Sequence, residues 1–191
     1  MNAIKPGART RAKEKGSHGL IIVYTGEGKG KTTAALGMAL RAVGRGWYVL
    51  MIQFGKGSWH YAELESSQRL KPEFEIVPMG LGFYKILDDA HSETEHRRAA
   101  NDALAFASAQ MLSGKYDMLI LDEINGMLAS GLLALADVMA LLDAKPDGLT
   151  LVLTGRYAPP ELMERADLVT EMREIKHPYQ KGILAQKGID Y

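Results

Sequence analysis

Hydrophobic and polar positions along the chain alternate between short apolar runs and longer stretches with helical periodicity. The runs at 118–121 and 149–153 are apolar at almost every position, which is typical of strands buried on both faces of a parallel sheet. Apolar runs predict strands near 20–24, 47–53, 74–78, 117–122, 149–154 and 167–172. The stretches between them predict helices near 31–44, 61–70, 92–112, 126–142 and 159–165. This alternation predicts an α/β domain with a mainly parallel sheet and right-handed connections.

The loop after the first predicted strand has the composition of a phosphate-binding loop. It reads Thr-Gly-Glu-Gly-Lys-Gly-Lys-Thr-Thr over residues 25–33 and lies between an apolar run and a helical pattern. A strand, a glycine-rich loop ending in Gly-Lys-Thr and a helix together make a P-loop. The usual pattern is G-x-x-x-x-G-K-[ST], and Thr25 stands here at the first glycine position. A Gly/Lys-rich surface turn is the alternative interpretation, and the strand–loop–helix context argues against it.

The residue types of this loop indicate how it binds a nucleoside triphosphate. Glycines let backbone N–H groups turn onto phosphate oxygens, and the following helix directs its positive N-terminus at the same charge. We expect Lys31 to contact the terminal phosphates and the Thr32 hydroxyl to reach a bound Mg²⁺. The candidate ATP-binding residues are Gly26, Glu27, Gly28, Lys29, Gly30, Lys31, Thr32 and Thr33.

Two acids, Asp122 and Glu123, follow the apolar run at 118–121. Acids often end strands in solvent, so this pattern alone is weak evidence for a site. Together with the Gly-Lys-Thr loop it predicts the Walker B element of a P-loop site, in which a carboxylate holds Mg²⁺ directly or through water. Thr32, Asp122 and Glu123 are therefore the candidate metal ligands.

Four other segments each leave two interpretations open. Arg156 either clamps a phosphate with its planar fork of donors or is an exposed loop arginine. The loop at 53–59 either faces a ligand or is a simple connector. Phe83 and Tyr84 either meet a large, flat, apolar partner or cover the core. The polar stretch at 173–182 either wraps back over the site or forms a surface tail.

Composition sets limits on these interpretations. The chain has 191 residues, 47% of them hydrophobic, which suits one globular domain over residues 18–191. The 23 basic and 23 acidic residues balance, so no global field favours nucleic acid or a membrane surface. Residues 1–17 are basic and form either a solvated tail or a flexible arm over an anionic ligand. There is no cysteine and no apolar stretch of bilayer-spanning length, so we expect a cytoplasmic protein without a membrane partner.

No nucleophile–base pair is apparent in the sequence. Cysteine is absent, and no G-x-S-x-G motif occurs. The four histidines considered as metal ligands lack ligand spacing and are assigned structural or surface roles; they are His18, His60, His91 and His96. The residues by themselves indicate an Mg²⁺–nucleoside triphosphate site in a P-loop α/β domain, with an unidentified second substrate.

Several segments together resemble the ATP:corrinoid adenosyltransferases of the BtuR/CobO/CobP type. The P-loop string at 19–35, including its threonine variant, is similar to the loop of this family. The other matching segments are Gln53-Phe54 with Lys56-Gly57, Leu121-Asp122-Glu123, Thr154-Gly155-Arg156, the stretch at 169–177 and the ending Lys187-Gly188-Ile189-Asp190-Tyr191. Their order and spacing hold from about residue 18 to the C-terminus.

The resemblance implies a RecA-like three-layer P-loop domain and a specific reaction. A corrinoid reduced to cobalt(I), such as cob(I)alamin, cob(I)yrinic acid a,c-diamide or another cob(I)inamide-type corrinoid, attacks the 5′ carbon of ATP, and triphosphate leaves. Lys31 and Arg156 are then the candidate catalytic residues, and Phe83 and Tyr84 the candidate corrinoid contacts. The family also implies a homodimer, and a reductant protein such as a flavoprotein as a partner.

One departure concerns the corrinoid side of the site. Family members often have Phe-x-Trp where this chain has Phe83-Tyr84-Lys85, so its corrinoid pocket is expected to be built differently. A P-loop ATPase or small-molecule kinase remains an alternative function, in which Glu123 orients water or an acceptor hydroxyl. A non-enzymatic module that binds ATP or a finished cofactor is a third.

Overall fold

The computed structural model describes residues 18–57, 61–82, 84–85 and 89–190. Its strands form one six-stranded parallel sheet in the order β3-β2-β4-β5-β1-β6. The strands are β1 Ile21–Thr25, β2 Val49–Gln53, β3 Phe74–Pro78, β4 Met118–Asp122, β5 Thr150–Thr154 and β6 Leu168–Glu171. The helices are α1 Lys31–Gly44, α2 Ala62–Arg69, α3 Glu93–Leu112, α4 Ile124–Ala129, α5 Leu135–Asp143 and α6 Pro160–Arg165, and a 3₁₀ turn, η1, spans Pro178–Lys181.

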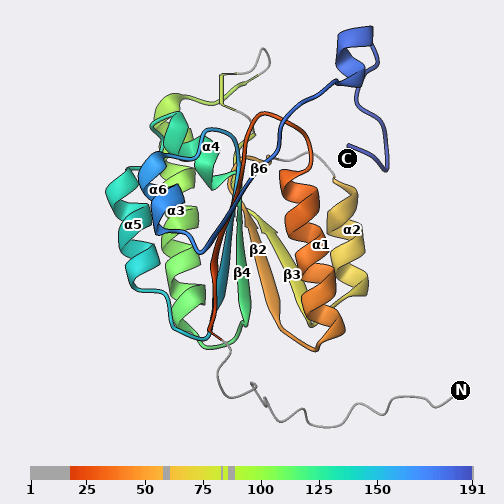
Figure 1. The fold of residues 1–191 in the computed structure, drawn as a ribbon. Helices are drawn as coiled ribbons and strands as arrows, with labels where there is room; N and C mark the ends of the chain where they lie inside the picture. The colour runs from red at the N-terminus through yellow and green to blue at the C-terminus, as the bar shows by residue number, and fades with distance from the viewer. Residues whose placement is uncertain (1–17, 58–60, 83, 86–88, 191) are drawn as a thin grey trace, which may run out of the picture.

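Helices cover both faces of the sheet, which gives the three-layer architecture that the sequence predicted (Figure 1). Helices α1 and α2 lie on one face, and α3 to α6 lie on the other. Every residue of β2, β4 and β5 is buried, as expected for central parallel strands covered on both sides. The predicted strands and most predicted helices agree with the observed elements within about two residues.

The single helix predicted at 126–142 is wrong, because the structure has two helices there. Helix α4 begins at Ile124 and ends at Ala129, and α5 begins only at Leu135. Gly131 adopts a left-handed φ of 70°, and its N–H donates to the carbonyl of Leu128. A glycine in this conformation is a common helix terminator, and it turns the chain back onto the end of α4.

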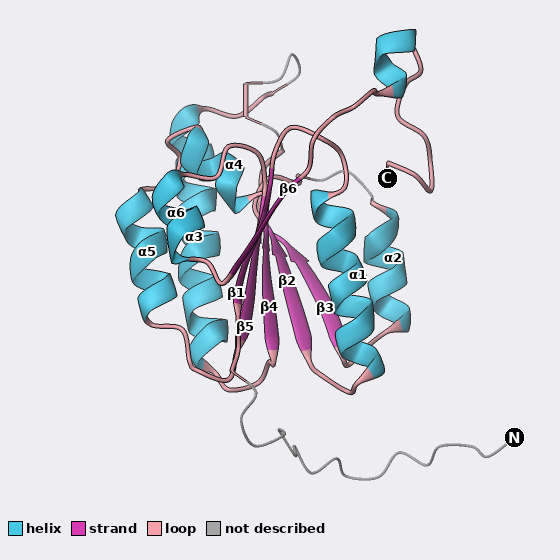
Figure 2. Cartoon of the chain, in the orientation of Figure 1, coloured by secondary structure: helices cyan, strands magenta, loops and turns pink. Residues whose placement is uncertain are grey.

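The sheet topology creates the place for a ligand. Figure 2 shows the loops that follow the strands gathered at one edge of the sheet. The chain leaves β1 through α1 on one face and leaves β4 through α4 on the other. Strand β5 lies between β1 and β4, and the crevice beyond these three carboxyl ends is where open α/β sheets bind ligands. Among the described residues, no helix is long and apolar enough to cross a membrane.

Candidate active site

The P-loop joins β1 to α1, and its lysine is folded back onto the loop. Lys31 is buried, and its Nζ donates to the carbonyl oxygens of Gly26 at 2.7 Å and Gly28 at 2.8 Å. Burial lowers the pKa of Lys31, and the charge of Arg156 acts in the same direction against the opposing charge of Glu123. The loop therefore places a desolvated cation at the N-terminus of α1, where a bound polyanion would favour its charged form.

Asp122 lies at the end of β4 and is completely buried beside the P-loop. Its Oδ1 accepts hydrogen bonds from the hydroxyls of Thr32 at 2.8 Å and Thr154 at 2.7 Å. Its Oδ2 has no hydrogen-bond partner in the described part of the chain. Burial raises the pKa of Asp122, because the charged form has lost its water. An unsatisfied buried carboxylate oxygen beside a threonine hydroxyl is a donor set that fits Mg²⁺.

Glu123 turns the chain from β4 into α4 in a left-handed conformation, with φ 65°. Its N–H donates to Thr154 Oγ1 at 3.0 Å, and its side chain lines the cleft. Burial, and after it the neighbouring charge of Asp122, raises the pKa of Glu123. The charge of Lys31 opposes this increase. The two predicted acids therefore have different surroundings, since Asp122 lies behind the cleft wall and Glu123 faces the cleft.

Thr25, the residue at the variant position of the P-loop, has a structural role that the sequence did not reveal. Its Oγ1 accepts a hydrogen bond from the N–H of Ala158 at 3.1 Å. Asn125 holds the same loop, because its Nδ2 donates to the carbonyl of Gly155 at 3.2 Å. These two contacts fix the segment that carries Arg156 next to the P-loop. The signal in the sequence was the threonine itself, which replaces a glycine by a side chain that can form this bond.

The loop after β2 faces the cleft rather than serving only as a connector. Lys56 forms an ion pair with Glu63, and its Nζ lies 4.1 Å from the centre of the Tyr61 ring. Gln53 Nε2 also donates to Glu63, at 3.3 Å. Lys56, Tyr61 and Glu63 all line the cleft. Tyr61 and Glu63 were not predicted from the sequence, because nothing in their local pattern marks them as more than the start of a helix.

These segments surround one cleft with a volume of about 1170 Å³. Of the predicted site residues, those that line it are Glu27, Gly28, Lys29, Gly30, Lys31, Thr32, Thr33, Tyr84, Glu123 and Arg156. Gly26 and Asp122 are not among the lining residues but bond directly to Lys31 and Thr32. Phe83, the basic segment 1–17 and His60 lie outside the described residues. The cleft exceeds the usual range for small-ligand pockets and has room for more than a nucleotide.

The C-terminal segment wraps back over the P-loop, which settles the choice left open for 173–182. The N–H of Gly28 donates to the carbonyl of Met172 at 2.7 Å. Farther along, Asp190 Oδ1 lies 2.6 Å from the ammonium of Lys29. This contact lowers the pKa of Asp190. Glu174, together with residues 185 and 188–190, lines the cleft, and Figure 1 shows the segment above the carboxyl edge of the sheet.

We predict that Asp190→Asn loosens this segment without destabilising the domain. Both partners of the Lys29–Asp190 pair are partly exposed, so water screens the pair and it contributes little to the stability of the domain. We expect tryptic cleavage after Arg173 or Lys176 to become several-fold faster, with Tm changed by less than about 3 °C. Glu164→Gln, at an exposed position of α6, is the matched control. Cleavage at the wild-type rate would show that the ion pair does not hold the segment.

For two glycines, one in the P-loop and one in the helix that follows it, we predict opposite effects of substitution by alanine. Gly26 has φ 92°, and an added Cβ would lie 2.5 Å from the carbonyl oxygen of Met172. Gly37 lies inside α1, where an added Cβ meets nothing within 4 Å. We expect Gly26→Ala to destabilise the protein by about 1–3 kcal/mol and Gly37→Ala to stabilise it by about 0.5–1 kcal/mol. Urea unfolding measures both, and equal effects would contradict the loop conformation described.

The three-layer parallel fold, the P-loop and the acids at the end of β4 together define a P-loop NTPase-like domain. Solved structures agree with this fold. The flagellar accessory protein FlaH from Methanocaldococcus jannaschii has a TM-score of 0.54 at 15% identity, over 81% of this chain and 71% of that protein. The RadB recombinase has a TM-score of 0.52 at 12% identity, over 84% of this chain and 77% of that protein.

Sequence comparison narrows this class to one family. The family model for the ATP:corrinoid adenosyltransferase BtuR/CobO/CobP matches residues 17–191. The corrinoid adenosyltransferase of Escherichia coli K12 is 37% identical over 180 residues, covering 94% of this chain and 89% of the relative. The corrinoid adenosyltransferase CobA of Salmonella typhimurium LT2 is 38% identical over 184 residues, with the same coverage. The chain therefore belongs to the ATP:corrinoid adenosyltransferase family.

Proposed function

We propose that this protein transfers the 5′-deoxyadenosyl group of ATP to the cobalt(I) of a reduced corrinoid and releases triphosphate. The reaction serves adenosylcobalamin biosynthesis or salvage. The observation that carries the proposal is the shared cleft. The P-loop, Glu123, Arg156 and Tyr84 all line one space of about 1170 Å³, in a member of the adenosyltransferase family.

The chemistry of the reaction agrees with the residues of the cleft. Cobalt(I) donates an electron pair to C5′ of ATP and becomes cobalt(III), while the bond between C5′ and the α-phosphate oxygen breaks. The electron pair of the broken bond leaves with the triphosphate. The nucleophile carries no proton, so the reaction needs no general base, in keeping with a sequence in which no nucleophile–base pair was apparent. Catalysis then depends on positioning the reactants and on stabilising the charge of the leaving group.

The P-loop supplies this electrostatic stabilisation. Lys31 bonds to two carbonyls of its own loop and lies within reach of phosphates that enter the cleft. The N-terminus of α1 is directed at the same place, and Arg156 adds a second cation to the lining of the same cleft. In our proposal, Lys31 moves from the loop carbonyls to the triphosphate, and Arg156 stabilises the charge that develops on it.

Thr32, Asp122 and Glu123 would hold Mg²⁺ on the triphosphate. The free Oδ2 of Asp122 and the Thr32 hydroxyl are the fitting oxygens, and Glu123 offers a carboxylate from the cleft side. When bound, Mg²⁺ neutralises charge on the phosphate oxygens as a Lewis acid. Thr154 holds the Asp122 carboxylate in place by donating to its other oxygen.

We extend the proposal to the corrinoid and the partners. Tyr84 borders the cleft and, with Phe83, would contact the corrin ring. Either cob(I)alamin or cob(I)yrinic acid a,c-diamide would be the substrate. A homodimer, a flavoprotein reductant and a cytoplasmic location complete the proposal, which follows the family resemblance.

An anaerobic assay tests this function. The protein is mixed with Mg-ATP and chemically reduced cob(I)alamin, the absorbance is followed, and the released phosphates are analysed. We expect a light-sensitive adenosylcobalamin and one triphosphate for each molecule formed. Inorganic phosphate without a cobalt–carbon bond would contradict the proposal and favour a P-loop ATPase. Binding of both substrates without turnover would instead indicate a carrier.

A further inference from the structure

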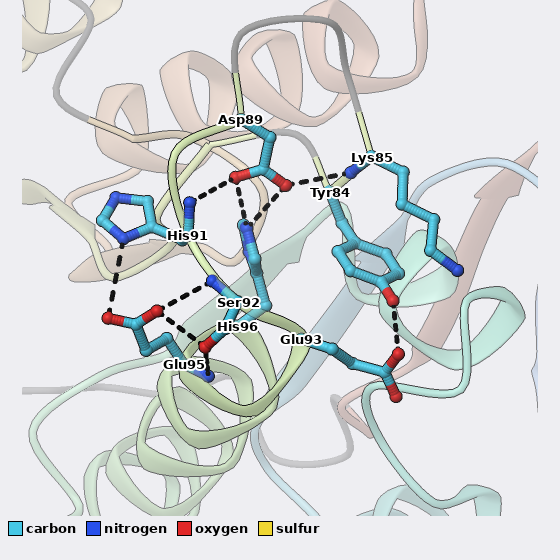
Figure 3. A network of polar contacts seen from close by, with 8 residues as sticks. All are labelled: Tyr84, Lys85, Asp89, His91, Ser92, Glu93, Glu95 and His96. Carbon is cyan, nitrogen blue, oxygen red and sulfur yellow. Dashed lines mark hydrogen bonds and ion pairs between the residues drawn. The ribbon is translucent and has the colours of Figure 1, made fainter.

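The carboxylate of Asp89 ties the loop before α3 to the first turns of that helix. Its Oδ2 accepts the N–H of Lys85 at 3.0 Å, and its Oδ1 accepts the N–H of His91 at 3.1 Å (Figure 3). The ring nitrogen Nε2 of His96 lies 2.9 Å and 3.0 Å from the same two oxygens. These contacts, with that of His96 first among them, lower the pKa of Asp89 to about 2, so the carboxylate is ionised and Nε2 donates.

The pair of His96 and Asp89 is shielded from water, unlike the other polar contacts of this region. The side chains of His96 and Asp89 are only 4% and 10% exposed. His91 and Glu95 are 41% and 58% exposed and approach only to 4.0 Å. Although two histidines and several acids gather here, no group of three or more that could hold a metal ion occurs among the described residues. The buried pair therefore needs an explanation other than metal binding.

The buried pair contacts Tyr84, which borders the cleft. The His96 ring packs edge-on against the Tyr84 ring with centroids 5.3 Å apart. The Tyr84 hydroxyl donates to Glu93 Oε2 at 2.7 Å, so α3 contacts this side chain at both its ring and its hydroxyl. The next residue, Lys85, has φ 62°, a conformation that L residues rarely adopt, and Asp89 accepts its N–H.

We propose that His96 and Asp89 are positioning residues that set the affinity for the corrinoid by holding Tyr84 at the edge of the cleft. The proposal rests on the proposed function, in which Tyr84 contacts the corrin ring. The proposal assigns the His96–Asp89 pair to the side of the cleft that binds the corrinoid and not to the side that binds the phosphates. In our proposal, His96 acts on the Tyr84 side only and takes no part in binding the triphosphate, since within the described part of the chain the hydrogen bonds of its ring go to Asp89.

The kinetic test uses two substitutions of His96. His96→Phe keeps a ring against Tyr84 but removes the donor to Asp89, and His96→Gln retains an amide donor near the position of Nε2. We expect His96→Phe to raise KM for cob(I)alamin roughly tenfold, because small displacements of a contact group are costly. KM for ATP should stay within about twofold, and His96→Gln should restore most of the corrinoid affinity. In a Tyr84→Ala background, His96→Phe should have almost no further effect.

Hydrogen exchange provides a readout that does not depend on activity. We expect the amides of Lys85 and His91 to exchange faster in His96→Phe, and also in Asp89→Asn if the first variant folds poorly. Unchanged exchange of these two amides in both variants would show that the His96–Asp89 pair does not hold the loop before α3. Equal increases in KM for ATP and corrinoid, or an undiminished effect of His96→Phe without Tyr84, would overturn the positioning role. A wild-type protein that forms no adenosylcorrinoid would instead refute the proposed function. The exchange data would still test whether the His96–Asp89 pair holds the loop before α3.

Discussion

Replacing Lys31 by alanine is expected to reduce adenosyl transfer by roughly 10²–10³-fold, the usual cost of removing a group that stabilises transition-state charge. Lys31 is the buried cation of the P-loop, and its ammonium lies between the loop carbonyls and the cleft. The substitution removes positive charge from the place where the triphosphate leaves. Single-turnover absorbance with saturating ATP and cob(I)alamin measures this rate.

Two further variants separate charge from loop geometry. Lys31→Met keeps an unbranched side chain in the same space but has no charge, so it should be as slow as Lys31→Ala. Lys29→Ala removes a cation that is 44% exposed, and we expect a loss of no more than about tenfold. Corrinoid binding should be unchanged in all three proteins. A Lys31→Met variant with near-normal rates would refute the role of the charge.

Replacing Asp122 by asparagine is expected to slow the reaction by roughly 100-fold while raising the Tm of the metal-free protein by about 2–4 °C. Activity falls because the free oxygen that fits Mg²⁺ becomes an amide nitrogen. Stability rises because a buried carboxylate with an unsatisfied oxygen is costly, and the neutral amide costs less. Asparagine can still accept the hydroxyls of Thr32 and Thr154.

The stability gain of this variant has a defined pH dependence. Burial raises the pKa of Asp122 in the folded protein above its value in the unfolded chain, so the folded state binds the proton more tightly. Wild-type stability therefore falls as the pH rises through the window between the two pKa values. The advantage of Asp122→Asn should grow as the pH rises toward and past the raised pKa of the folded state, and it should disappear below about pH 4, near the pKa of an aspartate in the unfolded chain. A variant that is less stable than wild type at neutral pH would contradict this account.

The architecture was predictable because it depends on local patterns. Apolar runs such as 118–121 identify buried strands by themselves, and the P-loop is contiguous in sequence. The error at 126–142 has a local cause as well, because apolar periodicity continues past Gly131 and hides the break that its left-handed conformation makes. Periodicity records which residues are buried and does not record where the backbone turns.

The parts of the site that depend on contacts between residues far apart in the chain could not be predicted from the sequence. Arg156 could be placed beside the P-loop only through bonds from Thr25 and Asn125, which join residues 30 to 133 positions apart. The C-terminal segment has no periodicity that predicts its path. Among the described residues, its return to the P-loop is made by the ion pair of Asp190 with Lys29 and by backbone contacts such as that of Met172 with Gly28. Such contacts have no signature in the sequence of either partner alone.

The most direct test of adenosyl transfer follows the 5′ carbon of ATP. ATP labelled with ¹³C at C5′ is turned over anaerobically with a cobalt(I) corrinoid, and the products are examined by ¹³C and ³¹P NMR. We predict that the label appears in a carbon bonded to cobalt, with an equal amount of intact triphosphate. Label found only in ADP or AMP, with free phosphate or pyrophosphate, would contradict the proposed reaction.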